Sequence, residues 1–581
     1  MKNGEIFKLK KEIERLKRAV KKQDYGLVWM DVPEAFEDDV ENKLPILKEV
    51  PELAIKNNDG KPTHILIEGD NYHALTCLNY THKGKIDVIY IDPPYNTGSD
   101  GFRYKDKRIL DKFPDGSDVP ANHPFRHSYW LSFMAKRLEL AKYILKESGL
   151  IFISIDDNEF AQLKLLCDEI FDPSNFISII ALRVSPPNGV KTAHAKKTII
   201  KEKEFVLVYA KNKDKINFTP QFKKADKWDK HFNSFINKPN KDYKSWTVAP
   251  LSEKLKGLGL VADLENIDFL EFISKNSDNI FQPVGLAKIK NIKKYNQDKI
   301  ILIDGMNGYY AYKGRQVQLL SKSLKETPEG LTLSRLVCDL WNDISFNNLF
   351  QEGGVDLKFG KKPVELVKRI IKLSTQNNNS IILDFFAGSG TTGEAVMGLN
   401  EGDIGQRQFI LVTNNDEVIN GENHKIMTDL CYPRMKNVIK GYNNKKGLGN
   451  SIKYYKTAFI GKNNILKATD EDKVELAHNA GELLAIAENT LELVKQNKYY
   501  QLFEDGNKEK YTAVYFREEL DKFEEFTEQV KKLKEKTAVY VFSWGDEEKI
   551  DDFADLDQIR VKTIPLPILE IYKQIYNLSA E

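Results

Sequence analysis

Residues Asp87–Gly98 read DVIYIDPPYNTG, and the fold of the chain follows from this stretch. Its apolar run, Val88–Ile91, is typical of a buried strand in a parallel sheet, where hydrophobicity need not alternate. The two prolines that follow cannot donate hydrogen bonds to a neighbouring strand, so the strand must end at Asp92, at the edge where open α/β sheets bind ligands. An acid, rigid carbonyls and the ring of Tyr95 suit a flat substrate with an exocyclic amine; a plain strand end followed by a turn is the alternative.

The composition is that of a soluble, folded protein of several domains. The chain has 581 residues, of which 41% are hydrophobic and 30% are charged, so about two to four domains are expected. No apolar run approaches membrane-spanning length, and the first residues are too charged for a signal peptide, which predicts a cytoplasmic protein. The cysteines show no metal-ligand spacing, so we expect reduced thiols and no metal site. They are Cys77, Cys167, Cys338 and Cys431.

Strand and helix patterns alternate around the opening stretch. A short strand beginning at His64 ends in Gly-Asp70, and this second strand-terminal acid suggests a parallel strand beside that of Asp92. Asp70 could instead cap the helix that follows it. The alternation predicts a doubly wound α/β sheet. The next expected elements are a helix over 130–145 stopped by Gly149, a strand over 150–155 and a helix over 159–171.

Three segments do not follow this alternation. Residues 4–23 predict an amphipathic helix, either docked on its own chain or in a dimer contact. Residues 99–127 predict a long loop, and long loops are usually functional or disordered. Residues 176–184 and 205–209 predict a hairpin with a long basic tip. The candidate phosphate contacts in this tip are Lys191, Lys196 and Lys197.

The composition and the pattern of the sequence change between residues 211 and 350. Residues 211–250 hold ten lysines and four aspartates, a net charge of +6, with aromatic residues between them. Basic residues neutralise phosphates, and aromatic residues reach bases or fill a small core. We expect an insertion that faces nucleic acid; a lysine-rich solvated face is the alternative. The candidate contacts are Lys223, Lys224, Lys227, Trp228 and Arg315.

The sheet pattern returns with ILDFFAGSGTT at 382–392, which predicts a strand, a tight glycine turn and a helix. Gly388 and Gly390 would let the backbone approach a cofactor at the N-terminus of that helix. The chain has no phosphate-loop Gly-Lys-Ser/Thr and no third glycine at dinucleotide spacing, which favours a nucleoside-type cofactor without a pyrophosphate. Asp416, after the next strand at 408–412, is the candidate acid for the ribose hydroxyls.

The C-terminal part shows no catalytic spacing and is predicted to be a separate α+β domain with a structural or partner-binding role. A helix over 425–441, bent near Pro433, precedes it. Its expected elements are a helical stretch over 470–497, a strand over 511–516, a helix over 518–536 and a strand over 538–542.

The two motifs together resemble those of amino-directed DNA methyltransferases of the permuted β group, and in particular the modification (Mod) subunit of type III restriction–modification systems. The resemblance is carried, in this order along the chain, by Asp92-Pro93-Pro94-Tyr95 and Phe386-Ala-Gly388-Ser-Gly390. Supporting matches are 67–75, 130–138, 151–159 and the Lys362-Pro363 start of a helix. The resemblance implies a circularly permuted, Rossmann-like methyltransferase sheet with an inserted target-recognition domain.

The resemblance also implies methyl transfer from S-adenosyl-L-methionine to N6 of an adenine flipped out of double-stranded DNA. Asp92 and the Pro93 carbonyl would accept the two amino hydrogens, and Tyr95 would stack on the base, with Pro94 completing the motif. The candidate cofactor-binding residues are Asp384, Phe386, Gly388, Gly390, Thr391, Asp70, Phe359 and Asp416.

The expected parts of the chain are five. They are an N-terminal helix and arm (1–62), a catalytic half (63–210), a target-recognition domain (211–350), a cofactor-binding half (351–445) and a C-terminal domain (446–581). A homodimer and a restriction (helicase–nuclease) subunit are the protein partners that the resemblance implies.

Several functions remain as alternatives. The chain could be a solitary methyltransferase, or could act mainly as a DNA-recognition platform for a helicase–nuclease partner. It could methylate N4 of cytosine, although the acid of Asp92-Pro-Pro-Tyr favours adenine because cytosine-directed members usually carry serine there. RNA is disfavoured as a substrate by the large insertion.

Overall fold

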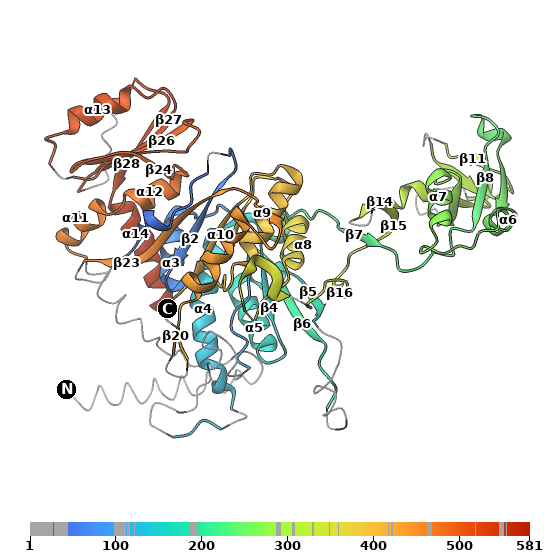
Figure 1. The fold of residues 1–581 in the computed structure, drawn as a ribbon, viewed down its shortest axis with the longest axis horizontal. Coiled ribbons are helices and arrows are strands. Elements are labelled where there is room, and N and C mark those ends of the chain that lie inside the picture. The colour runs from blue at the N-terminus through green and yellow to red at the C-terminus, as the bar shows by residue number, and fades with distance from the viewer. Residues whose placement is uncertain are drawn as a thin grey trace. The chain divides into compact units, whose positions relative to one another are not determined.

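The apolar run of DVIYIDPPYNTG forms strand β3, Ile86–Ile91, inside a large mixed sheet (Figure 1). Strand β3 pairs in parallel with β17, Ile381–Asp384, and with β4, Leu145–Ile155. All six of its residues except Asp87 are buried, as expected for a strand covered on both faces. The glycine-turn strand and the Asp92 strand are therefore direct neighbours.

The structure, a computed structural model, describes most of the chain. The described residues are 27, 29, 44–57, 59–97, 108, 112, 117–120, 123–184, 196, 198–285, 292–304, 308–327, 330–347, 349–357, 360–415, 417–419, 422–461, 468–517, 519–544, 551–553 and 555–580. They fall into two units, Met1–Thr219 with Asp339–Glu581, and Pro220–Cys338. The expected N-terminal helix at 4–23 and most of the expected loop at 99–127 lie outside the described residues.

Ten strands of the first unit form the main sheet in the part of the chain that the structure describes. Neighbours from β23 to β4 run in parallel, whereas β1, β6 and β5 are antiparallel additions at the two sides. The spatial order is β1 (Leu44–Glu49), β23 (Ser451–Ile460), β2 (Thr63–Glu68), β18 (Gln408–Thr413), β17, β3, β4, β6 (Lys203–Ala210), β5 (Phe176–Arg183) and β16 (Leu340–Trp341).

Helices cover both faces of this sheet, which confirms the doubly wound prediction. On β3, Ile89 and Ile91 belong to the hydrophobic cluster that includes residues of α3, α4 and α5, whereas Val88 and Tyr90 are buried towards the opposite face. Helix α9 contacts both α8 and α10 in a second layer. The helices are α3 (Asn71–Thr81), α4 (Ser128–Ile144), α5 (Phe160–Phe171), α8 (Val364–Ser374), α9 (Thr391–Asp403) and α10 (Tyr432–Lys440).

Two local predictions in this half are wrong. Strands β2 and β3, which end in the acids Asp70 and Asp92, are not neighbours, because β18 and β17 lie between them. Helix α4 ends at Ile144, and Gly149 does not stop it but lies inside β4. A Cβ at Gly149 would lie 3.0 Å from the Ile86 carbonyl oxygen, beside a register shift between β3 and β4, so glycine is needed there for close strand packing.

The predicted hairpin is confirmed by the antiparallel pairing of β5 with β6. Most of its tip, 185–195 and 197, lies outside the described residues. The helix expected over 425–441 is interrupted just before Pro433 by a π-helical turn, Met427–Cys431, and continues as α10.

The second unit, Pro220–Cys338, is a small α+β fold with its own core. An antiparallel six-stranded sheet and a three-stranded sheet pack with two helices around buried residues such as Phe232, Phe269 and Ile280. The strands of the larger sheet are β11 (Ile301–Leu302), β12 (Tyr310–Tyr312), β13 (Arg315–Leu319), β10 (Ile280–Val284), β8 (Ser234–Asn237) and β9 (Thr247–Pro250). The other elements are β14 (Leu324–Thr327), β15 (Gly330–Leu336), β7 (Phe222–Lys224), α6 (Leu251–Gly257) and α7 (Ile267–Lys275).

We expected the C-terminal part to form a separate domain from residue 446, but its first strand belongs to the main sheet. Strand β23, 451–460, inserts between β1 and β2 in the main sheet. Further on, Tyr572 donates a hydrogen bond of 3.0 Å to the Pro45 carbonyl, and buried residues within 44–47 and 568–575 share one core with α3. This part of the prediction is wrong because β23 supplies a parallel neighbour that the pattern of short apolar segments did not reveal.

A five-stranded sheet follows, with an antiparallel half and a parallel half. The predicted helix over 470–497 is instead two short helices and a strand, and the helix predicted over 518–536 is shorter. The elements are α11 (Asp470–His478), α12 (Gly481–Glu488), β24 (Glu492–Gln496), β25 (Tyr500–Glu504), β26 (Lys510–Tyr515), α13 (Phe523–Lys531), β27 (Lys536–Phe542), β28 (Ile559–Ile564) and α14 (Leu566–Ala580). Two small strand pairs lie before it, β19 (Glu417–Ile419) with β20 (Glu422–His424), and β21 (Gly441–Tyr442) with β22 (Lys445–Lys446).

Candidate active site

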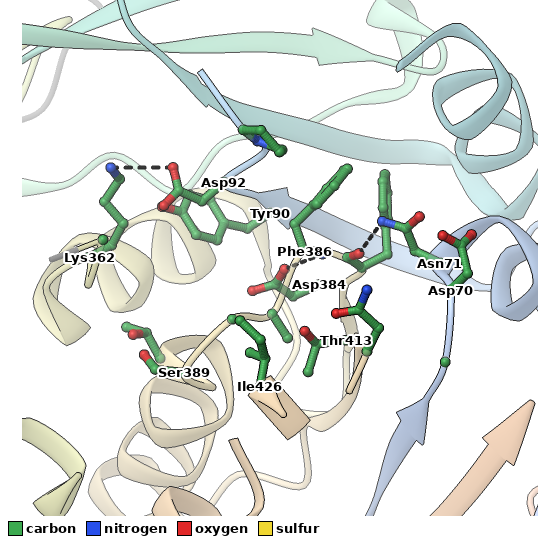
Figure 2. Close-up of a pocket in the computed structure, with 18 of the residues that line it drawn as sticks. Asp70, Asn71, Tyr90, Asp92, Lys362, Asp384, Phe386, Ser389, Thr413 and Ile426 are labelled. Atoms are coloured by element: carbon green, nitrogen blue, oxygen red, sulfur yellow. Dashed lines mark hydrogen bonds and ion pairs between the residues drawn. The ribbon is translucent and has the colours of Figure 1, made fainter. Parts of the chain in front are cut away.

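A pocket opens at the carboxyl ends of β2, β3 and β17, and both sequence motifs line it (Figure 2). Asp92 and Pro94 come from the first motif, and Phe386, Gly388 and Thr391 come from the second. Strand pairing brings these distant segments together, since β17 lies directly beside β3. The other lining residues are Gly69, Asp70, Asn71, Tyr90, Arg108, Phe133, Gly360, Lys362, Asp384, Phe385, Ala387, Ser389, Thr413, Asn414 and Ile426.

Asp92 lies in a network of charged and polar side chains. The Tyr95 hydroxyl donates a hydrogen bond of 2.6 Å to its Oδ1, and the ammonium of Lys362 lies 3.3 Å from the same oxygen. Lys362 also pairs with Glu204 of β6 at 3.0 Å, and its ammonium lies 4.9 Å from the centre of the Tyr95 ring. Figure 2 shows Lys362 and Asp92 pointing toward each other. Four side chains from three separate parts of the chain thus meet at the end of β3.

Burial and charge act in opposite directions on this network. Burial raises the pKa of Asp92 above its usual range, while Lys362 and the Tyr95 hydrogen bond work to lower it. Burial lowers the pKa of Lys362, but the carboxylates of Asp92 and Glu204 outweigh burial and raise that pKa overall. Lys362 therefore stays charged at neutral pH.

The backbone of the Asp92 motif is fixed by hydrogen bonds on its far side. The indole of Trp130 donates to the Pro94 carbonyl at 2.7 Å, so this carbonyl, one of the two rigid carbonyls that we expected to suit a substrate amine, is already engaged. The carbonyl of Pro93 accepts no hydrogen bond from any residue that the structure describes. Only one of the two rigid carbonyls is therefore left for a substrate amine.

The residue after Tyr95 is held by a buried acid. Asn96 adopts a positive φ of 60° and donates to Oε1 of Glu159 at 2.6 Å. His127 reaches the same oxygen at 2.8 Å, and its hydrogen bond to Glu159 raises the pKa of this histidine. Glu159 is only 1% exposed. The loop that leaves the catalytic motif thus starts from a defined direction.

The glycine turn is shaped from within by Asp384. Its carboxylate accepts a hydrogen bond from the Phe386 backbone N–H at 3.0 Å and one from the Thr392 hydroxyl at 2.6 Å. Gly390 has a φ of 81° and forms the N-cap of α9. Burial raises the pKa of Asp384 to about 7. Since its oxygens are engaged within the turn, Asp384 serves first to shape the pocket wall.

A buried arginine of α10 secures the other side of the turn. The guanidinium of Arg434 donates to Ser389 Oγ at 3.0 Å and to Thr391 Oγ1 at 2.7 Å, and it pairs with Glu394 at 2.8 Å. Arg434 is fully buried. These contacts tie the first turn of α9 to α10 and hold the turn in one conformation.

A second basic residue secures the segment before Lys362. The ammonium of Lys361 donates to the carbonyls of Leu349, Glu352 and Val355 at 3.3, 3.0 and 2.7 Å. Burial lowers the pKa of Lys361 to about 8. Lys361 thereby folds the 349–355 segment against the start of α8 and fixes the backbone from which Lys362 reaches Asp92.

Asp70 combines a capping role with a place in the pocket. Its carboxylate accepts from the Tyr72 N–H at 2.7 Å as the N-cap of α3, and it pairs with buried Arg137 at 3.2 Å. The Asp70 side chain is 30% exposed, on the pocket side. Asp70 therefore caps a helix, as one of the two readings predicted, and it also lines the cavity; its contact with a cofactor stays a prediction.

The predicted site residues divide into three groups. Asp92, Pro94, Asp384, Phe386, Gly388, Thr391 and Asp70 line the pocket, and Tyr95 contacts Asp92. Gly390 packs behind the turn, where a Cβ would lie 3.1 Å from Cys431 Sγ. The predicted residues that lie outside the described part of the chain are Phe359, Asp416, Lys191 and Lys197.

The predicted nucleic-acid contacts in the second unit differ in exposure. Lys227 and Arg315 are exposed, as is Lys196 of the hairpin tip in the first unit. Lys223 and Lys224 are half-buried on β7, where Lys224 pairs with Glu265 at 3.2 Å. Trp228 packs edge-on against Phe269 in the core of this unit, with ring centres 5.0 Å apart. The Trp228 ring therefore contributes to folding whatever else it contacts.

Sequence reasoning missed Lys362, Glu204 and Arg434 as site residues. Lys362 was visible only as the residue before a helix-starting proline, and Glu204 only as one acid in a basic hairpin. Their roles arise because β6 and the start of α8, both distant in sequence from β3, bring these two side chains to the end of β3. A buried cation such as Arg434 carries no local sequence pattern that would distinguish it from an exposed one.

Two features are absent from the residues that the structure describes. No group of three or more histidine, cysteine, aspartate or glutamate side chains there is arranged to hold a metal ion. No helix in that part of the chain is long and apolar enough to cross a membrane.

Known proteins are similar in sequence to a large part of this chain. The chain is 34% identical over 407 residues to the type III restriction–modification enzyme EcoPI Mod subunit of Escherichia phage P1, covering 61% of this chain and 58% of that one. It is 32% identical over 387 residues to the StyLTI Mod subunit of Salmonella typhimurium, covering 62% and 54%. The type II methyltransferase M.KpnI of Klebsiella pneumoniae is 29% identical over 367 residues, covering 60% of this chain and 80% of that one.

The similarity to these relatives extends over only part of their length. The chain spans between 52% and 58% of the length of the type III Mod subunits that it matches. The family model described as DNA methylase, of the N6/N4 methyltransferase type, matches residues 86–420. That range begins with β3 and includes both pocket motifs and the second unit. The chain belongs to the DNA methylase family.

Proposed function

We propose that this protein is a site-specific DNA methyltransferase that transfers a methyl group from S-adenosyl-L-methionine to N6 of adenine. We further propose that it is the modification and specificity subunit of a type III restriction–modification system. The single observation that carries the proposal is the pocket that Asp92 shares with the Phe386–Thr391 turn, since it brings an amine-binding carboxylate and a cofactor-type turn into one cavity.

The pocket residues fit the proposed cofactor. Gly388 lines the cavity with a φ of 50° and no Cβ, so the backbone can approach a ligand closely. The rings of Phe133 and Phe386, with centres 5.7 Å apart, and Ile426 offer apolar surface for a flat base. Asp70 offers an acceptor for hydroxyl or ammonium groups. S-adenosyl-L-methionine would supply the electrophilic methyl group at this site.

The protein side of the reaction follows from the geometry at Asp92. The lone pair of an adenine N6 is delocalised into the ring, so the amine is a weak nucleophile. A carboxylate acceptor at Asp92 and a carbonyl acceptor at Pro93 would bind its two hydrogens and stabilise the positive charge that develops on nitrogen. Tyr95, held by Asp92 at 2.6 Å, would lie against the base. The target base must leave the duplex to reach these groups, at a cost of a few kcal/mol.

The second unit supports DNA as the substrate. The lysine-rich segment 211–250, which runs into this unit from the end of the first, carries a net charge of +6 from ten lysines and four aspartates. Lys227 and Arg315 of the second unit are exposed. Exposed cations of this kind neutralise phosphates and give salt-dependent affinity. We propose that residues 211–350 recognise the target sequence and that Lys196 with Lys191 and Lys197 of the hairpin tip contact the backbone.

The names of the relatives support the type III assignment, because four of them are type III Mod subunits at 30–34% identity. On this proposal the protein forms a homodimer and works with a restriction subunit in the cytoplasm. A second candidate, a solitary methyltransferase, is favoured by M.KpnI, a type II enzyme whose length this chain covers to 80%.

The proposal is tested by incubating the purified protein with tritiated S-adenosyl-L-methionine and unmethylated plasmid DNA, then digesting the DNA to nucleosides. Label in N6-methyladenine is the expected result, and label in N4-methylcytosine would reassign the substrate. Asp92→Ala, which should fold normally, is expected to incorporate no label. Wild-type protein that transfers no methyl group to either base would contradict the proposed function.

A further inference from the structure

Two residues outside both sequence motifs converge on Asp92. Lys362 precedes α8, and Glu204 lies on β6, the strand that pairs antiparallel with β4. The ammonium of Lys362 lies 3.3 Å from Asp92 and 3.0 Å from Glu204, and the Tyr95 hydroxyl lies 2.6 Å from Asp92 and 3.4 Å from Glu204. One cation and one hydroxyl are thus shared between the same two carboxylates.

The cluster is buried enough for its charges to interact strongly. The Lys362 side chain is 10% exposed, that of Asp92 20% and that of Glu204 23%. With all three ionised, the cluster carries two negative charges and one positive charge, a net charge of −1. A single net negative charge suits a reaction in which positive charge develops on the substrate nitrogen. Two carboxylates without the lysine would instead favour uptake of a proton.

We propose that Lys362 and Glu204 are positioning residues that set the ionisation and orientation of Asp92 for methylation of the amine. Lys362 keeps Asp92 charged and oriented through its Oδ1. Glu204 holds Lys362 in place and offsets its charge, so that the ammonium does not oppose the positive charge on the substrate. This inference rests on the proposed function, because it assigns roles toward the same reaction.

Other groups around Asp92 do not replace this pair. Tyr90 and Tyr95 face Asp92 from its own segment, and burial raises the pKa of both phenols well above the usual value. Both therefore stay neutral in the working pH range. Asp384 on the neighbouring strand β17 adds a repulsion, and Arg108 lies on the pocket wall beside Phe133. Of the groups in the described residues that contact Asp92, only Lys362 is positively charged.

The direction of each mutational effect follows from these charges. Removing the charge of Lys362 removes an interaction that lowers the pKa of Asp92, so Asp92 should need a higher pH to ionise. Removing the charge of Glu204 removes one that raises it, so the opposite change is expected. A nearby opposite charge changes a carboxyl pKa by about one to three pH units.

The test is the pH dependence of single-turnover methylation, measured from pH 5.5 to 9 with saturating DNA and S-adenosyl-L-methionine. In Lys362→Met the acid limb of the profile should move up by about one pH unit or more, so that activity lost at pH 6.5 returns at pH 9. In Glu204→Gln the midpoint of the acid limb should lie at a lower pH than in Lys362→Met, and at a pH no higher than in the wild type. The double variant should fall between the two single variants.

Matched variants separate charge from shape. Lys362→Arg keeps the cation and should keep the acid limb near its wild-type position even if the rate falls. Lys372→Met and Glu365→Gln remove the same groups from exposed positions on α8 and should leave the profile unchanged. Circular dichroism and cofactor titration of each variant verify that it folds and binds.

The outcomes are distinct. A Lys362→Met profile that is lower at every pH but has an unmoved acid limb would overturn the inference and leave Lys362 a purely structural role. The inference would also be overturned if the acid limb of Lys362→Arg moved to higher pH by as much as that of Lys362→Met. Wild-type protein without methyl transfer would contradict the proposed function itself, which is a different failure.

Discussion

The side-chain amide of Asn71 donates a hydrogen bond of 2.9 Å to the backbone carbonyl of Phe385, although the two residues are 314 positions apart. Asn71 opens helix α3 after Asp70, and Phe385 opens the glycine turn. The carbonyl oxygen of the same Asn71 amide accepts from Arg137, which is fully buried. One buried side chain therefore ties the start of α3 to the start of the glycine turn.

Asn71→Ala is expected to lower both stability and cofactor affinity. It leaves the Phe385 carbonyl and one donor of Arg137 without this partner, and each buried group left unsatisfied costs about 1–3 kcal/mol. Urea unfolding and a cofactor titration measure the two effects. Asn71→Asp keeps the acceptor for Arg137 and loses only the donor to Phe385, so it should affect binding more than stability. Unchanged binding in both variants would contradict this role for Asn71.

Arg434→Met is expected to destabilise the fold by about 3–5 kcal/mol, because it leaves Glu394 in a largely buried position without its cation. It also frees the hydroxyls of Ser389 and Thr391, so cofactor affinity should fall with stability. Lys436→Met, an exposed change on the same helix, should alter neither. A melting temperature for Arg434→Met equal to that of the control would show that the turn does not depend on this arginine.

The two glycines of the turn should respond differently to substitution. Gly390→Ala puts a Cβ 3.1 Å from both Cys431 Sγ and Met435 Cε at a φ of 81°, so it should cost stability beyond the roughly 1–2 kcal/mol of a left-handed residue. Gly388→Ala has its nearest neighbour, the Phe386 carbonyl oxygen, at 3.9 Å and should cost less. Gly388→Asp should weaken cofactor binding by filling the pocket wall. Thermal melts and cofactor titrations give the comparison, and equal binding by wild type and Gly388→Asp would place the cofactor elsewhere.

His127 should make stability depend on pH in a defined direction. The hydrogen bond to Glu159 raises the pKa of His127 in the folded protein, so the folded state favours the protonated ring. That stabilisation is complete below the unfolded pKa of about 6.5 and is lost as pH rises through the higher folded value. The melting temperature of the wild type should therefore exceed that of His127→Gln by more at pH 5.5 than at pH 8.5. A difference that grows with pH would contradict the pairing with Glu159.

The strand-terminal motifs could be predicted from the sequence because their signals are local. Proline after an apolar run ends a strand, and glycine pairs after another strand mark a tight turn, so the places of Asp92 and Gly388 in one pocket follow once both strands are assigned to one parallel sheet. The order of the strands in the sheet could not be predicted from such local signals. Nothing local to Asp70 or Asp92 indicates that two strands from residues 381–413 lie between their own strands.

The site residues and the strand that we did not predict from the sequence have a common physical cause. Lys362, Glu204 and Arg434 matter because of where three-dimensional packing brings them, and lysine, glutamate and arginine are otherwise typical surface residues. Trp228 is an aromatic residue in a basic segment for which we predicted a nucleic-acid contact; it is partly buried and packs against the core of its unit, a role that the sequence alone did not distinguish from a base contact. Strand β23 was missed because its partners, β1 and β2, are about 400 residues earlier in the chain.

Adenine-N6 methylation of DNA at a defined sequence can be tested directly in a host without DNA methylation. The chain is expressed there and modified bases are mapped across the host DNA at single-nucleotide resolution, with Asp92→Ala expressed in parallel. N6-methyladenine is expected at one short recurring sequence in the wild-type strain, and none is expected in the Asp92→Ala strain. Unmodified DNA from cells that contain the folded wild-type protein, or methylation that persists in the Asp92→Ala strain, would contradict this expectation.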